Sequence, residues 1–171
     1  QRSIWNCNKY YYPGRDIQLK DTIFNDHQIY DQLKKFVLLV KNKYSIPIDN
    51  IINEYKTIII ERKYDRFFDK FILNNIIVNI KKNKFLKFEG VKILENLSFY
   101  EQLKLFSENK VFIFRHGSSL INLLWIPNNS IIFDIDIIPC RKEIVRRIAK
   151  ITNSKVFSLD YNNIDYRIFS N

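Results

Sequence analysis

Apolar residues follow two patterns that alternate along the chain: short continuous runs, and residues repeated at helical spacing. Runs of β-branched and aromatic residues predict buried strands at 57–60, 111–115, 131–135 and 155–159, with a further strand somewhere in 85–94. Apolar residues at helical spacing predict helices at 26–43, 67–81, 98–107, 118–125 and 141–151. This alternation predicts an α/β fold, a Rossmann-like parallel sheet with helices on both faces.

The first residues have a different character. Residues 1–24 are expected to be an irregular lead-in, in which 10–12 are a candidate strand before the turn at Pro13 and Gly14. No internal repeat or low-complexity linker divides the rest, so a single domain over 1–171 is expected. Because the sequence contains no methionine, we expect it to be part of a longer chain with residues missing before Gln1.

Composition limits the class of protein. Hydrophobic residues make up 46% of the chain, which is enough for a sizeable core. No apolar stretch approaches the ~20 residues of a membrane span. The polar residues that begin the sequence lack the apolar segment of a signal peptide. Cys7 and Cys140 are too far apart in sequence for a zinc motif and are expected to be free thiols.

The net charge of +10 suggests a nucleic-acid partner. The composition that produces this charge argues against one. The sequence has 19 Lys against 9 Arg, and 29 Ile and 19 Asn against the single Ala149. Codon bias in an AT-rich genome, such as that of a giant DNA virus or an AT-rich microbe, raises lysine content without selecting a basic patch. A solvated basic surface is therefore preferred to a nucleic-acid site, while electrostatic help in binding an anionic substrate stays open. Localisation stays open too, with the cytoplasm or a virus factory favoured over a secretory lumen.

The turn between the strand at 111–115 and the helix at 118–125 carries the most informative residues. It uses one of three glycines and one of two histidines in the sequence Arg115, His116, Gly117, Ser118, Ser119. Ligands of open α/β sheets bind at the carboxyl ends of strands, where a helix start offers N–H groups to a phosphate. The turn therefore predicts a site for an anionic ligand that contains a nucleotide.

The order of polar residues around this turn resembles glycosyltransferase family 61. The family pattern is a Glu-Gln pair on a helix, a strand, a His-Gly turn, a Pro-x-x-Ser turn and a strand that ends in an acid. The matches here are Glu101, Gln102, His116, Gly117, Leu120, Asn122, Leu123, Leu124, Pro127, Ser130 and Asp134. Arg62 and Arg66, after the strand at 57–60, resemble a family arginine pair, and the resemblance is best over 56–160.

Five positions depart from the family pattern. Arg115 and Phe114 stand where small residues are common, Ser118-Ser119 replaces Ala-Gly, and Asp134 replaces Glu. Loss of the second glycine limits how closely the backbone can approach a phosphate. These departures bear on activity more than on fold.

The resemblance implies the C-terminal, donor-binding lobe of a GT-B glycosyltransferase, with the acceptor lobe before Gln1. It implies transfer of a sugar from a nucleoside diphosphate donor, with UDP as the expected nucleotide, to a glycan or protein hydroxyl with inversion. The catalytic base is expected in the missing lobe, and no metal or other cofactor is required. The alternative is a degenerate lobe that keeps the fold and acts as an interaction module.

The residues of the candidate site have alternative roles. Arg62 and Arg66 are expected to clamp the diphosphate, or else to be surface arginines paired with Glu61 or Asp65. His116 and Gly117 with the amides of Ser118 and Ser119 are expected at the phosphates, although His116 could simply be satisfied at a strand end and Ser118 could be a plain cap.

The secondary site residues are Gln102, Glu101, Asn122 and Asp134. Gln102 is a candidate contact to the nucleotide, whereas Glu101 is also explained by a capping box with Ser98. Asn122 is expected to brace the loop more than to bind. Asp134 and Asp136 spell a D-x-D, but at the end of a buried strand a ribose contact or a structural role is preferred to a metal site.

Overall fold

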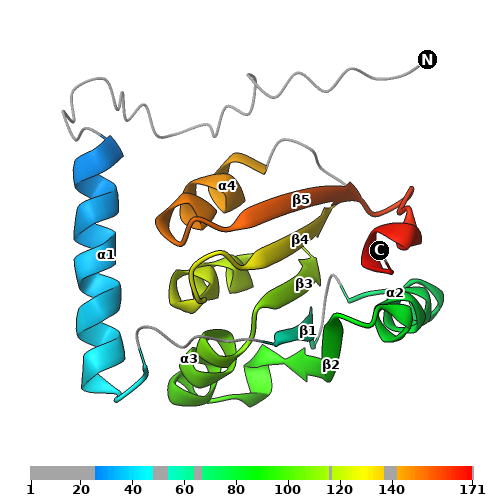
Figure 1. Cartoon of the computed structure of the whole chain (residues 1–171), viewed down its shortest axis with the longest axis horizontal. Helices are drawn as coiled ribbons and strands as arrows, with labels where there is room; N and C mark the ends of the chain where they lie inside the picture. The colour runs from blue at the N-terminus through cyan, green and yellow to red at the C-terminus, as the bar shows by residue number, and fades with distance from the viewer. Residues whose placement is uncertain (1–25, 48–53, 64–66, 116, 137–141, 171) are drawn as a thin grey trace, which may run out of the picture.

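The computed structural model describes residues 26–47, 54–63, 67–115, 117–136 and 142–170 (Figure 1). The candidate strand at 10–12, both cysteines, Arg66 and His116 lie outside these ranges.

Five parallel strands form one sheet in the order β2-β1-β3-β4-β5. They are β1 (Tyr55–Glu61), β2 (Leu86–Ile93), β3 (Val111–Arg115), β4 (Ile131–Asp136) and β5 (Lys155–Asp160). β1 and β3 are buried along most of their length because neighbouring strands and both helical layers cover them. The predicted parallel α/β sheet is confirmed.

Helices cover both faces of the sheet, as predicted. One face carries α2 (Lys70–Lys82) and the short 3-10 helix η5 (Tyr166–Phe169). The other carries α3 (Phe99–Glu108), η3 (Ser118–Trp125) and α4 (Lys142–Ile151), with α1 (Asp26–Lys43) packed outside them (Figure 1). Side chains alternate between the two cores, so Ile58 and Ile60 face the α3 layer while Ile59 faces α2.

The strand order creates a switch point between β1 and β3. From β1 the chain moves outward through α2 to β2, then crosses back through α3 on the opposite face to β3. The turns that follow β1 and β3 therefore diverge to opposite faces of the sheet and leave a crevice between them. In folds of this kind that crevice is the usual ligand site.

Gly90 lies inside the stretch 85–94, in which the sequence predicts a strand without fixing its bounds. Thr57 pairs with Phe88 and Ile58 with Gly90, so the ladder shifts by one residue at this point. Gly90 has φ +112, a conformation that L side chains rarely adopt. The glycine forms a bulge inside the strand and does not end it.

One detail makes the sequence-based expectations more specific, and two differ from them. Residues 118–125 form a 3-10 helix, although their leucine spacing predicts a helix without specifying its type. α2 begins only at Lys70, because the Asp69 side chain accepts a hydrogen bond from Phe71 N and caps the helix there. Phe67 and Phe71, both inside the range 67–81 predicted as a helix with an apolar face, are 58% and 72% exposed.

No helix in the described part of the chain is both long and apolar enough to cross a bilayer.

Candidate functional site

The crevice at the switch point contains a cavity of about 240 Å³. Its walls come from the end of β1, from the start of α3 and the turn before it, and from η3. The lining residues are Glu61, Arg62, Leu94, Glu95, Gln102, Ser119, Ile121 and Asn122. Four of these, Arg62, Gln102, Ser119 and Asn122, belong to the candidate site that the sequence predicts.

Arg62 lies directly beside Gly117, across the gap between the turns after β1 and β3. A Cβ added to Gly117 would stand 2.9 Å from Nη1 of Arg62. The side chain of Arg62 is 23% exposed, and its Nε lies 3.8 Å from Oε1 of Glu95, whose side chain is 39% exposed. The guanidinium is therefore half-buried, with the glycine backbone of residue 117 on one side and the Glu95 carboxylate on the other.

The start of η3 adds backbone donors to this corner. The first intrahelical bond runs from Leu120 N to Gly117 O at 3.2 Å. The amides of Ser118 and Ser119 precede that bond, as the first N–H groups of any helix do. An anion beside Gly117 would meet these amides and the Arg62 guanidinium together.

Gln102 and Asn122 form the back wall of the cavity. Gln102 Nε2 donates to Leu94 O at 3.1 Å and to Leu97 O at 3.0 Å. Its Oε1 accepts from Asn122 Nδ2 at 3.2 Å. Both ends of the Gln102 amide are engaged, so in this structure it joins the turn before α3 to Asn122 on η3.

Glu101 and Asp134 lie differently from the cavity residues. Glu101 Oε2 accepts from both the backbone N and the Oγ of Ser98 at 2.7 Å, which completes the capping box of α3. These hydrogen bonds lower the pKa of the exposed Glu101 carboxyl. Asp134 is 2% exposed in β4, paired in register with Phe114 and Ser158. Neither residue lines the cavity.

Arg115, an unusual residue at its position, points away from the cavity. It follows Ile113 on the α2 face of β3, and its Nη1 donates to Phe67 O at 2.9 Å. Its guanidinium lies 4.0 Å from the ring centre of Tyr161. The alternation of side chains along a strand could have indicated this direction from sequence alone.

Glu61, at the end of β1, is a site-lining residue that the sequence analysis mentions only as a partner for an arginine. It is 9% exposed, and its Oε1 accepts from Phe68 N at 3.0 Å. Burial raises the pKa of the Glu61 carboxyl, against the opposing effects of that hydrogen bond and of the positive charge of Arg115. The end of β1 thus holds a buried carboxyl whose charged form burial disfavours, bonded to the segment that enters α2.

Acidic, histidine and cysteine side chains do not come together in threes as a potential metal site among the residues that the structure describes.

Comparison with known proteins adds one positive result. The family model described as Glycosyltransferase 61 matches residues 5–133, which is 129 of 171 residues. The match includes the β1 and β3 turns and all of the lining residues of the cavity. No curated protein matches the chain.

Proposed function

The chain belongs to glycosyltransferase family 61, and from this premise we propose that its cavity binds the diphosphate of a nucleoside diphosphate sugar. The observation that carries the proposal is the placement of Arg62 against Gly117 at the switch point. A guanidinium and the amides of Ser118 and Ser119 converge there, and this combination of donors suits a phosphate. In the full site, Arg66 and His116 would add to it.

The size of the cavity limits which part of the donor it takes. Ligand pockets for whole small molecules are typically ~300–1,000 Å³. The cavity of about 240 Å³ is smaller, so it suits the diphosphate, and the nucleoside and the sugar would extend beyond it. UDP is the nucleotide that we propose, on the basis of the family resemblance.

The proposed reaction is sugar transfer to a hydroxyl group of a glycan or protein with inversion. The acceptor oxygen forms a bond to the anomeric carbon while the bond from that carbon to the diphosphate oxygen breaks, and a base takes the acceptor proton. We place that base in a preceding lobe of a GT-B enzyme. Arg62 would offset the negative charge that develops on the departing diphosphate, a role that needs no metal ion.

Glu95 supports a second candidate function. Its carboxylate lies 3.8 Å from Arg62 Nε, where it would compete with a phosphate for the same guanidinium. A lobe in which this pair had replaced donor binding would keep the fold and act as an interaction module.

Ligand-observed NMR of the chain with UDP-, GDP- and other nucleotide sugars tests the proposal. We expect one donor to bind and its binding to be lost in Arg62→Ala and weakened in His116→Ala. Arg146→Ala is the matched control, because Arg146 is an exposed arginine on α4 and does not line the cavity. Donor binding that survives Arg62→Ala would contradict the proposed site, and absence of all donor binding would favour the interaction module.

A further inference from the structure

The chain segment that enters α2 is held at three consecutive residues by three different elements. Arg115 Nη1, from β3, donates to Phe67 O at 2.9 Å. Phe68 N donates to Glu61 Oε1, from β1, at 3.0 Å. Asp69 N donates to the hydroxyl oxygen of Tyr161, just after β5, at 2.9 Å. This segment is the end of the turn that begins with Arg62.

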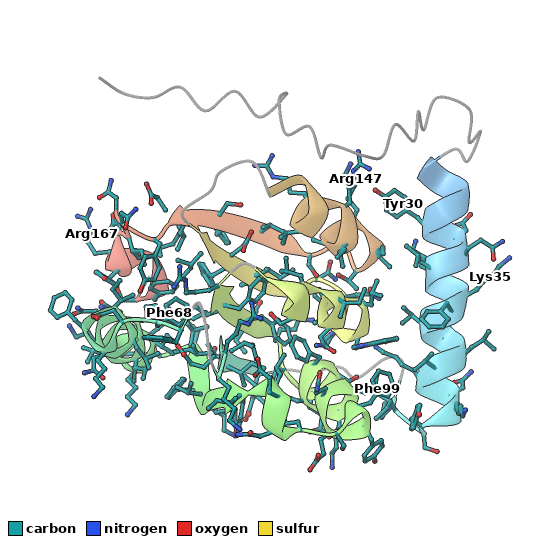
Figure 2. All side chains as sticks on the ribbon, turned by 180° about the vertical axis from the view of Figure 1, so that it is seen from behind. Tyr30, Lys35, Phe68, Phe99, Arg147 and Arg167 are labelled. Carbon is teal, nitrogen blue, oxygen red and sulfur yellow. The ribbon has the colours of Figure 1, made fainter. Side chains whose placement is uncertain are left out.

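Aromatic packing also joins two of the anchoring side chains, Arg115 and Tyr161, to Phe68 of the segment itself. The Arg115 guanidinium stacks on Tyr161 at 4.0 Å, and the Tyr161 ring stacks on Phe68 with centroids 6.3 Å apart. Phe68, labelled in Figure 2, is 3% exposed in the core between α2 and the sheet. The stack of Arg115, Tyr161 and Phe68 therefore extends from the partly exposed end of β3 into the core.

Arg115 sits in this stack at a cost that a purely structural side chain would avoid. Its Nε is buried and has no hydrogen-bond partner among the residues that the structure describes. Leaving a buried donor unpaired costs about 1–3 kcal/mol, more for a charged group. An apolar side chain of similar length would pack on Tyr161 without that cost.

We propose that Arg115 is a positioning residue that fixes residues 67–69 before α2 and, through Glu61, the guanidinium of Arg62 beside Gly117. Arg115 immediately precedes the β3–η3 turn, and its hydrogen bond reaches the end of the β1–α2 turn. It therefore connects the two turns that form the crevice. The inference rests on the proposed function, because it assigns Arg115 a purpose in holding a diphosphate-binding arginine.

Glu61 provides the physical link from Arg115 to Arg62. Glu61 directly precedes Arg62, bonds Phe68 N, and feels the positive charge of Arg115. Removing that charge would free Phe67 O and weaken the electrostatic hold on the Glu61 carboxylate. Both changes loosen the backbone on the two sides of the turn that contains Arg62.

Arginine suits this role better than lysine does. Its planar guanidinium can stack on Tyr161 and donate to Phe67 O at the same time, whereas an ammonium group offers charge and donors without a plane. Arg115→Lys should therefore still position Arg62 in part. Arg115→Met should not position it at all, although Met keeps much of the packing volume.

The test compares wild type, Arg115→Met and Arg115→Lys, with Arg167→Met as the control for loss of an arginine elsewhere. Arg167 is an exposed residue of η5 and is paired with Asp165, which precedes that helix. The first measurement is the Nε–H resonance of Arg62 in ¹⁵N NMR without ligand, and the second is the Kd for inorganic pyrophosphate and for UDP.

In Arg115→Met we expect a displaced or broadened Arg62 resonance and about fivefold weaker binding of both anions, with thermal unfolding close to that of wild type. Arg115→Lys should lie between wild type and Arg115→Met in both the Arg62 resonance and the anion affinity. Arg167→Met should match wild type in both. If Arg115→Met fails to fold, Arg115→Lys provides the same two measurements.

Two outcomes would overturn the inference. An Arg62 resonance unchanged in both Arg115 variants would show that Arg115 does not position Arg62, whatever the chain binds. Binding that Arg62→Ala abolishes and the Arg115 variants leave intact would overturn the inference while the proposed function stands. If wild type binds neither anion, the proposed function fails, and the Arg62 resonance alone decides whether Arg115 positions that side chain.

Discussion

The guanidinium of Arg62 occupies the space in which a side chain at residue 117 would begin. Nη1 of Arg62 would lie 2.9 Å from a Cβ built on Gly117, which is closer than real Cβ contacts come. The backbone of Gly117 is extended, with φ 177 and ψ −169, so any residue could adopt it. Glycine is required here for the space it leaves to Arg62.

Gly117→Ala should therefore impair anion binding more than folding. The alanine methyl group would push the flexible end of Arg62 aside, which costs little because no backbone needs to move. We expect about fivefold weaker donor binding, from one misplaced charged hydrogen bond, with less than about 1 kcal/mol change in the free energy of unfolding. NMR titration with the donor and urea denaturation measure the two effects.

Gly90→Ala is the matched control for that variant. Gly90 has φ +112, and a Cβ built on it meets nothing within 4 Å, so the added methyl group strains the backbone of β2 without touching Arg62. We expect it to lower stability by about 1 kcal/mol or more and to leave donor affinity unchanged. The interpretation of Gly117 would be wrong if the two glycine variants showed the same pattern of effects.

Glu95→Gln should strengthen donor binding. The Glu95 carboxylate lies 3.8 Å from Arg62 Nε and would repel an incoming diphosphate. Because both side chains are partly exposed, we expect a gain of about two- to threefold, measured by calorimetric titration at low salt. Glu108→Gln, which disrupts an exposed pair with Lys104 on the same side of the sheet, should have no effect. A loss of affinity in Glu95→Gln would mean that the carboxylate orients Arg62 productively.

The elements of this fold were predictable where one physical signal dominated. The runs of β-branched and aromatic residues at 57–60 and 111–114 predicted strands covered on both faces, and both lie in such strands. Ser98 with Glu101 predicted the start of α3 because a capping box satisfies helix amides locally. These signals are local, so the sequence alone was sufficient.

Other features depend on contacts between distant segments. Leucine spacing at 120, 123 and 124 cannot distinguish a 3-10 helix from an α-helix, because both bury the same face. The meeting of Arg62 with Gly117 follows from the strand order, which places β1 next to β3. The roles of Glu61 and Arg115 require knowledge of where Phe67, Phe68 and Tyr161 lie.

Gln102→Ala should destabilise the protein without removing a ligand contact. Its amide donates to Leu94 O and Leu97 O and accepts from Asn122, which is 6% exposed. The alanine variant leaves the buried Asn122 amide without this partner, which should cost about 1–3 kcal/mol in urea denaturation. Lys104→Ala, an exposed change on the same helix, should stay within about 0.5 kcal/mol of wild type. Loss of donor affinity with unchanged stability would instead support the alternative that Gln102 contacts the nucleotide.

Glu61 should make stability depend on pH in a defined direction. Burial raises its pKa in the folded protein above the ordinary value of 4.5, so the folded state holds the proton more tightly than the unfolded state does. The contribution of Glu61 to stability is therefore fully present below the unfolded pKa. It is lost as pH rises through the higher folded pKa, where ionising the buried carboxyl is costly.

Glu61→Gln tests this direction, because glutamine can still accept from Phe68 N but never ionises. We expect the stability of wild type relative to Glu61→Gln to fall as pH rises from about 4.5 to 7, measured by urea denaturation at several pH values. Asp165→Asn is the control with the opposite sign. The Arg167 side chain lowers the pKa of Asp165 to about 2, so its contribution is lost only as pH falls below the ordinary 3.8. A difference between wild type and Glu61→Gln that stays constant from pH 4.5 to 7 would show that the Glu61 carboxyl ionises as easily in the folded protein as in the unfolded chain.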